Sequence, residues 1–187
     1  MELMDAIKQR RATRSLKKVD ISDDDVKKLA EAANLAPSCF NNQPWNFVFV
    51  RDDDKLQELF DNMPKGNKWA HKASMIIGVF AKKDDDCAMG NREYFLFDTG
   101  FAVNNMMLKA TEMDYVAHPI AGFKPKPCAE AMIIPEDYVL ITLVIVGPKS
   151  DDINPVLSED MQKAEKNRPP RKELNEFVHH DTFKEKE

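Results

Sequence analysis

The stretch 36-APSCFNNQPWNFVFV-50 joins a predicted helix to a predicted buried strand, and the rest of the chain is organised around it. The segment Ser22–Asp25 supplies an N-cap serine followed by carboxylates, which favours the start of that helix. Pro37 ends the helix, because the residue before a proline avoids the α region. Asn46–Val50 is apolar and mostly β-branched or aromatic, as is typical of a buried strand. The small and polar residues 38–43 between them form a simple turn or, held rigidly at both ends, a binding loop for a flat polar ligand.

Length and composition predict one globular domain over residues 1–187, with 43% hydrophobic and 32% charged residues. The net charge of −5 argues against non-specific binding to nucleic acid. No apolar run approaches the roughly 18 residues that a membrane-spanning helix needs, so no membrane partner is expected. The polar N-terminus, 1-MELMDAIKQRR-11, lacks the apolar core of a signal peptide.

The three cysteines, Cys39, Cys87 and Cys128, are scattered, which predicts a reducing, cytoplasmic location rather than a disulfide framework. The adjacent histidines His179 and His180 lie in a polar tail, and sequence neighbours rarely converge on one metal, so no metal site is expected. The 6 glycines stand singly, so no glycine-rich phosphate loop is present. A nucleotide phosphate would therefore have to be held by side-chain cations.

Two basic segments could supply those cations. The first, 10-RRATR-14, follows a short predicted helix, and the second, 168-RPPRK-172, lies in the charged C-terminal part. Guanidinium groups match phosphate oxygens well, although a solvated surface is the alternative interpretation. The C-terminal part also carries apolar residues that a free tail would not need, so we expect it to pack, across a neighbouring subunit. These apolar residues are Leu174, Phe177, Val178 and Phe183.

The remaining pattern predicts an α+β protein. Short apolar runs indicate strands at 74–81, 114–117 and 137–147, and helices are expected at 54–62 and 127–133. The longest expected helix covers 91–113 and is apolar on nearly every face, so it must be buried on most sides. A second copy of the protein would supply that burial most easily, and a central helix inside a monomer core is the alternative.

Several segments together resemble one known family. The 36–50 stretch resembles the signature of the nitroreductase family of FMN-dependent oxidoreductases, which has a similar run of Pro-Ser, Asn and Gln-Pro-Trp. The 10–14 segment is similar to the family's Arg-Arg/His-Ser-x-Arg/Lys run, and 119-PIAGF-123 is similar to its Pro-Ile-x-Gly-Phe motif. The family also has a basic C-terminal run like 168–172. The resemblance implies an α+β nitroreductase-like fold: a mixed central sheet of four or five strands flanked by helices. It further implies a homodimer formed through the long central helix, with residues 150–187 of the single domain packing on the partner subunit.

The resemblance also implies non-covalent FMN and assigns residues to it. Arg10 would meet the phosphate and Arg14 the pyrimidine edge of the flavin, while Ala12 replaces the family's usual serine and removes one hydroxyl contact. The backbone of Pro119–Gly122 would pass the reactive flavin nitrogen N5, and glycine allows close approach because it has no Cβ. The implied cofactor-binding residues are Arg10, Arg11, Ala12, Arg14, Pro37, Ser38, Cys39, Asn41, Gln43, Asn67, Pro119, Ile120, Ala121, Gly122, Arg168 and Arg171.

Part of this implied site crosses between subunits. In the family, the Pro-Ser loop of one subunit contributes to the flavin site of the other, so Pro37, Ser38 and Cys39 would be contacts made across the dimer. Phe40 would face the open side of the ring, where substrates stack. Cys39 is expected to be a buried, inert thiol, because hydride transfer by a flavin needs no nucleophile. Asn67 is the nearest match to the family's amide that reaches the flavin ring.

The implied activity is electron transfer from NAD(P)H to a nitroaromatic, a quinone or a similar acceptor, by a ping-pong mechanism. No catalytic acid, base or metal is required, because the flavin does the chemistry and the protein supplies position and electrostatics. Two other interpretations remain open at this point. The protein could bind FMN as a storage or redox-sensing module, or its arginines could bind an unrelated anionic partner without any flavin.

Overall fold

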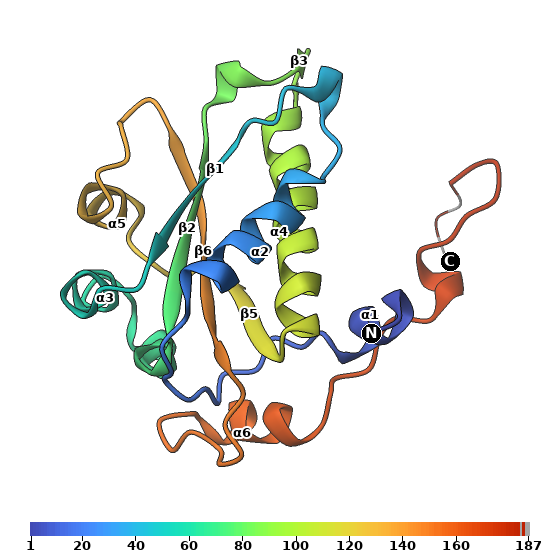
Figure 1. Ribbon diagram of the computed structural model, residues 1–187. Coiled ribbons are helices and arrows are strands. Elements are labelled where there is room, and N and C mark those ends of the chain that lie inside the picture. Colours follow the sequence, from blue (N-terminus) through green and yellow to red (C-terminus); the bar gives the residue numbers. More distant parts are fainter. Residues whose placement is uncertain (184, 186–187) are drawn as a thin grey trace.

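The computed structural model describes residues 1–183 and 185, and its centre is a four-stranded sheet with helices on both faces (Figure 1). The strands are β1 (Trp45–Val50), β2 (Met75–Ala81), β5 (Tyr115–Ile120) and β6 (Val139–Pro148), in the order β1-β2-β6-β5. Every neighbouring pair in this sheet is antiparallel. The α+β class, the four strands and the flanking helices are thus confirmed, whereas the expected mixed pairing is wrong for the described strands.

The helices divide between the two faces. Helices α2 (Asp23–Asn34) and α4 (Tyr94–Glu112) cover one face, and α3 (Asp53–Phe60) and α5 (Pro125–Ala131) cover the other (Figure 1). The remaining helical elements are α1 (Leu3–Gln9), α6 (Glu159–Lys166) and the 3-10 turns η1 (Cys39–Asn41), η2 (Lys65–Lys72), η3 (Lys83–Asp85) and η4 (Leu174–Glu176). No helix among the described residues is long and apolar enough to cross a membrane.

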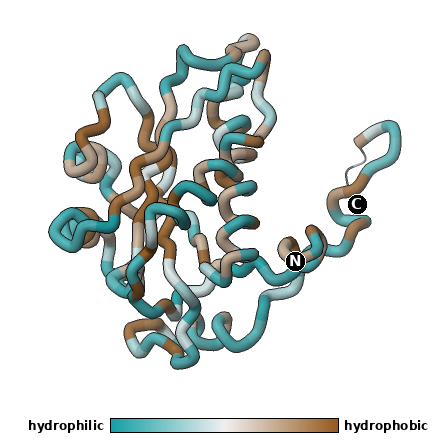
Figure 2. Tube along the Cα trace, viewed as in Figure 1, coloured by the Kyte–Doolittle hydropathy of each residue, from teal (hydrophilic) through white to brown (hydrophobic). Residues whose placement is uncertain are grey.

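Alternation along the strands builds two cores, one on each face. Ile77 and Val144 pack toward α2 and α4, whereas their neighbours Ile76 and Ile145 pack toward α3 and α5. Figure 2 shows the hydrophobic residues concentrated along the strands, between the two layers of helices. Because both faces are covered, the strands read as nearly continuous apolar runs, which is how the sequence revealed them.

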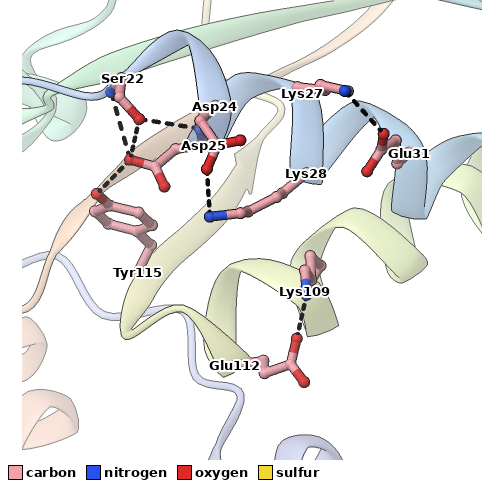
Figure 3. Close-up of polar contacts among 9 residues, drawn as sticks. All are labelled: Ser22, Asp24, Asp25, Lys27, Lys28, Glu31, Lys109, Glu112 and Tyr115. Atoms are coloured by element: carbon pink, nitrogen blue, oxygen red, sulfur yellow. Dashed lines mark hydrogen bonds and ion pairs between the residues drawn. The ribbon is translucent and has the colours of Figure 1, made fainter.

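The start of α2 is fixed as the sequence predicts. The backbone N–H of Asp25 donates to Ser22 Oγ (3.1 Å), and the Asp25 carboxylate accepts from the backbone N–H of Ser22 (3.4 Å), which completes a capping box (Figure 3). The Tyr115 hydroxyl donates to Asp25 Oδ2 (3.3 Å), which ties α2 to the start of β5. Exposed ion pairs such as Lys28–Asp24 (2.5 Å) lie on the same surface and contribute little to the stability of the fold.

The long helix α4 is buried on one face only. Residues such as Ala102 and Met106 are covered by the sheet, whereas Leu96, Phe97 and Phe101 remain 46%, 59% and 38% exposed. The helix is therefore not the centre of a monomer core, and an apolar stripe faces outward. The homodimer through α4 stays a prediction, with this stripe as its motive.

Three elements differ from the sequence-based expectation. Strand β5 continues through Pro119 to Ile120 instead of ending at Ala117, which is possible because β5 is an edge strand and the missing N–H faces outward. The chain also forms a small hairpin of β3 (Ala88–Met89) and β4 (Arg92–Glu93) before α4. Helix α6 forms in the charged region after β6, where no helix was expected, and Ser158 caps it.

The C-terminal segment after α6 runs away from the sheet, past α1 (Figure 1). Its apolar residues Leu174, Phe177 and Val178 are 71%, 57% and 44% exposed. Within one chain this part does not bury them, so the expected packing on a partner subunit stays a prediction. That expected extension runs to residue 187, and residues 184, 186 and 187 lie outside the described residues.

Candidate functional site

Both basic segments of the sequence line one cleft. The structure brings residues 10–14 and 168–171 together around a cavity of about 240 Å³, which we call the arginine cleft. Arg168 donates from Nη1 to the carbonyl of Lys8 (2.5 Å) and from Nη2 to the carbonyl of Arg10 (3.2 Å). Arg11 donates to the carbonyl of Ala164 in α6. The lining residues are Arg10, Arg11, Ala12, Arg14, Ala164, Glu165, Arg168, Pro169, Pro170 and Arg171.

The cleft has an excess of positive charge: it is lined by five arginines and by one carboxylate, that of Glu165. None of its arginines forms an ion pair with a carboxylate within residues 1–183 and 185. Glu165 accepts instead from the backbone N–H groups of Arg14 (3.0 Å) and Ser15 (3.1 Å). Burial, followed by the charges of Arg168 and Arg171, lowers the pKa of Arg10. Cations pressed together in this way would be stabilised by a bound anion such as phosphate.

One cation–π contact and two hydrogen bonds connect the arginine cleft to the Pro119–Gly122 motif. The Arg14 guanidinium lies 6.0 Å from the ring centre of Trp69, and the Trp69 indole donates to Asn67 Oδ1 (3.3 Å). Asn67 donates in turn to the carbonyl of Gly122 (2.7 Å). A Cβ added to Gly122 would lie 2.8 Å from Asn67 Nδ2, so a larger residue there would force the Asn67 amide to shift. Asn67 and Gly122 were expected in one site, and the structure brings them into contact.

The buried ring of His118 packs against this network. Its ring stacks on Trp69 with centroids 4.7 Å apart, and Nδ1 lies 3.2 Å from the Thr13 carbonyl, which places the proton on Nδ1. Burial is the main cause that lowers the His118 pKa to about 4, and the Arg14 charge acts in the same direction. The ring is therefore neutral at pH 7. Sequence reasoning missed Trp69, His118 and Glu165, and only the position of His118 directly before the Pro-Ile motif could have indicated one of them.

The loop of residues 37–43 lies elsewhere, near the start of α4, whereas the segment after α1, whose residues line the arginine cleft, passes the other end of that helix (Figure 1). An α-helix of 19 residues is about 28 Å long, so the two regions are well separated within one chain. Phe40 is 92% exposed and makes no wall for the arginine cleft of its own chain. The contribution of Pro37, Ser38 and Cys39 to a flavin site thus requires a second subunit, and it stays a prediction.

The conformation of this loop is unusual. Phe40, Asn41 and Gln43 have φ values of 47°, 61° and 51°, in the left-handed region that non-glycine residues seldom adopt. The Gln43 backbone N–H donates to Ser38 Oγ (3.0 Å), and Gln43 Nε2 donates to the Asn41 carbonyl (3.0 Å). The polar groups of the loop therefore serve first to hold its own shape.

The expectation of unpaired cysteines is wrong. Cys39 is half-buried and forms a disulfide with Cys87, so it is not a buried inert thiol. This pairing also removes the cysteine argument for a reducing compartment. Cys128 is the free cysteine of the chain; it is buried, and burial raises its pKa to about 11. Asp86 lies close to both bonded sulfurs, but sulfurs bonded to each other are not thiolate ligands for a metal.

Comparison with known proteins gives consistent results. Residues 7–74 and 61–148 match the model of the nitroreductase family. Over 156 residues the chain is 30% identical to an Archaeoglobus fulgidus protein named as a candidate NADH dehydrogenase/NAD(P)H nitroreductase, covering 81% of this chain and 87% of that protein. A solved structure described as an oxidoreductase containing FMN has a TM-score of 0.83 at 23% identity and covers 97% of this chain and 92% of its own. An Exiguobacterium sibiricum protein, solved in complex with FMN, has a TM-score of 0.79 at 24% identity, with coverages of 97% and 98%. Both solved structures share the fold of this chain.

Proposed function

The chain belongs to the nitroreductase family of oxidoreductases, and we propose that it is an FMN-dependent enzyme using NADH or NADPH as electron donor. Its acceptor would be a nitroaromatic, a quinone or a similar small molecule. The observation that supports this proposal most directly is the arginine cleft, which gathers cations from both ends of the sequence and leaves them without a carboxylate partner among the described residues. The FMN in two solved structures of the same fold supports the same cofactor.

The arginines of the cleft would have different roles in binding FMN. Arg168 already donates to two backbone carbonyls, so it chiefly fixes the segment that carries Arg10. Arg10 and Arg171 are then the side chains best placed to hold the phosphate, and their mutual repulsion would be relieved by its negative charge. This arrangement replaces the glycine-rich loop that many nucleotide-binding proteins use.

The network from Arg14 to Gly122 would position the ring. When bound, FMN supplies two-electron chemistry between a nicotinamide and an acceptor. Arg14, held against Trp69, would stabilise negative charge that develops at the pyrimidine edge. Asn67 fixes the Gly122 carbonyl, and the missing Cβ leaves the backbone of Pro119–Gly122 able to approach the ring. The chain then needs no side-chain acid or base.

We also propose that the site is completed in a homodimer. The exposed stripe of Leu96, Phe97 and Phe101 on α4 would be buried by a second copy of the chain. Apolar residues of the 150–187 extension would pack on that second copy. The exposed Phe40 of one subunit would then form a wall of the other subunit's site. A single open face of the flavin ring would bind NAD(P)H and the acceptor in turn, which would give ping-pong kinetics.

Cofactor binding tests the proposal. Protein purified in the presence of FMN should release flavin on heating or acidification, and its absence would show the proposal to be wrong. Replacing Arg10 with alanine should weaken FMN binding by about 1.5–3 kcal/mol, or about 10- to 150-fold, measured by flavin fluorescence. Arg92→Ala, on the exposed β3–β4 hairpin, is the matched control and should bind like the wild type.

Turnover separates an enzyme from a storage or sensing module. Steady NAD(P)H oxidation with a quinone or nitroaromatic is expected, and initial rates over a grid of both substrates should give parallel double-reciprocal lines. A protein that binds FMN but shows a single round of reduction would be a module without turnover. Intersecting lines would contradict the shared-site mechanism.

A further inference from the structure

A disulfide and two carboxyl groups meet at the start of α4, away from the arginine cleft. Cys39 belongs to η1 and Cys87 lies just before β3, 48 residues later. The backbone N–H of Cys39 donates to Asp98 Oδ2 (2.6 Å), and that of Cys87 donates to Asp86 Oδ1 (2.8 Å). A carboxylate oxygen of Asp86 and the two sulfurs all lie within 4.8 Å of one another. Whichever sulfur leaves when the bond is cleaved, an acid group is near it.

The two carboxyl groups are placed so that they can share a proton. Asp98 is only 2% exposed, and it forms no ion pair within the described part of the chain. Burial is the main cause that raises the pKa of Asp98, and the neighbouring Asp86 adds to the rise. Asp86 Oδ2 is buried without a hydrogen-bond partner, so it can accept a proton that Asp98 holds.

The disulfide also ties down the strained loop. Cys39 directly precedes Phe40 and Asn41, both in the left-handed region, and the bond attaches this segment to the residues before the β3–β4 hairpin. Asn42 adds a weaker tie, since its Nδ2 donates to Asp86 Oδ1 (3.2 Å) and contacts Cys87 Sγ (3.7 Å). Cleavage of the bond would leave the loop held by hydrogen bonds alone.

We propose that Cys39–Cys87 is a thiol–disulfide exchange site for a small thiol or dithiol, and that the Asp86–Asp98 carboxyl pair protonates the departing sulfur. The thiolate of the small molecule attacks one sulfur and forms a mixed disulfide. The Cys–Cys bond breaks, and its electron pair leaves on the other sulfur, which takes the proton of the carboxyl pair. A second thiol group then cleaves the mixed disulfide. Both cysteines become thiols, the small molecule becomes a disulfide, and the carboxyl pair regains a proton from solvent.

Thiol counting on the full-length protein tests the exchange, and it does not depend on flavin. After treatment with oxidised glutathione, native alkylation should modify none of the three cysteines, because Cys128 is buried. After dithiothreitol in native buffer, Cys39 and Cys87 should both be modified, as located by peptide mass, and oxidised glutathione should restore the bond. Hydrogen exchange in residues 38–43 should be faster in the reduced form. A bond that is reduced only after unfolding, or one that oxidised glutathione cannot form, would overturn the proposal.

Variants test the carboxyl pair separately. Asp98→Asn should slow native reduction by dithiothreitol at pH 7 by about tenfold or more, since proton donation to the leaving sulfur is lost. Asp86→Asn should have the same effect, and it serves if the first variant does not fold. Asp84→Asn, an exposed carboxylate two residues before Asp86, is the matched control and should react like the wild type. Wild-type rates in folded Asp98→Asn and Asp86→Asn proteins would remove the pair from the reaction.

Discussion

The neutral, buried ring of His118 should make the stability of the protein depend on pH. Burial first, and then the Arg14 charge, lower the pKa of His118 to about 4 in the folded chain, although the Thr13 carbonyl favours its charged form. A histidine in the unfolded chain titrates near 6.5. The difference between these two values corresponds to about 3 kcal/mol of unfolding free energy.

The sign follows from which state binds the proton. Between pH about 6.5 and about 4, the unfolded chain is protonated at this histidine while the folded chain is not, so the free energy of unfolding falls as the pH drops. The contribution is fully present above pH 6.5 and is lost by about pH 4. Carboxylates also titrate in this range, so the effect of His118 has to be measured as a difference between wild type and a variant.

His118→Asn provides that difference, because its amide can donate to Thr13 from the position of Nδ1. At pH 7.5 the variant should be less stable by about 0.5–1.5 kcal/mol, since it loses the stacking on Trp69. At pH 4.5 the difference in unfolding free energy should reverse, so that the variant is more stable than the wild type. Urea unfolding at fixed protein concentration, followed by circular dichroism, measures both values. His180→Asn, in the exposed tail, should track the wild type, and a pH-independent gap for His118→Asn would refute the reasoning.

Other changes probe the proposed ring-binding network, the proposed dimer and the proposed substrate wall. Gly122→Ala should destabilise the fold by about 0.5–1.5 kcal/mol in urea, because its Cβ would lie 2.8 Å from Asn67 Nδ2 and displace the amide from its hydrogen bond to the Gly122 carbonyl; Gly66→Ala, whose Cβ meets nothing within 4 Å, is the control. Phe97→Asp on the exposed stripe of α4 should give a monomer by light scattering where the wild type is a dimer, and a folded wild-type monomer at micromolar concentration would contradict this. Phe40→Ala should change kcat/KM ratios among acceptors more than it changes FMN affinity, and the opposite result would remove Phe40 from the substrate wall.

The fold was predictable where local signals and burial agree. Ser22 was predicted to cap α2 and does so, with Asp25 completing a capping box, and the apolar run Asn46–Val50 forms β1 as predicted. The pairing of the strands was not predictable in the same way, since continuous apolar runs suit parallel and antiparallel sheets alike. Helix α6 was missed because its segment is mostly charged, with Met161 and Ala164 as its apolar residues, and its stability depends on a cap at Ser158 and on contacts made far away in sequence.

The candidate site was predictable through its charges but not through its supports. Arginines are recognisable because a phosphate needs them in any fold. Trp69 and His118, in contrast, resemble ordinary core residues, and only the structure shows that they connect Arg14 to the Gly122 turn. The Cys39–Cys87 bond was missed for a related reason: scattered cysteines say nothing about which loops meet in space.

The two basic segments meet because the chain that leaves β6 pairs with the N-terminal segment. Strand β6 ends at Pro148, whose carbonyl accepts from the backbone N–H of Lys17 (3.0 Å), and Ser150 donates from its backbone to the Ser15 carbonyl (2.8 Å). The chain leaving β6 therefore runs antiparallel to the N-terminal segment, with Leu16 bridged to Lys149. After Ser150 the chain turns and forms α6, and side chains complete the contact: Glu165 accepts from the Arg14 backbone N–H, and Arg168 donates to the Arg10 carbonyl. The arginine cleft is thus built by a short stretch of backbone pairing followed by hydrogen bonds between side chains and the backbone, and these bring its cations together even though they repel one another. These hydrogen bonds offset the repulsion between the arginines, and the anion that we propose for this cleft would relieve it further.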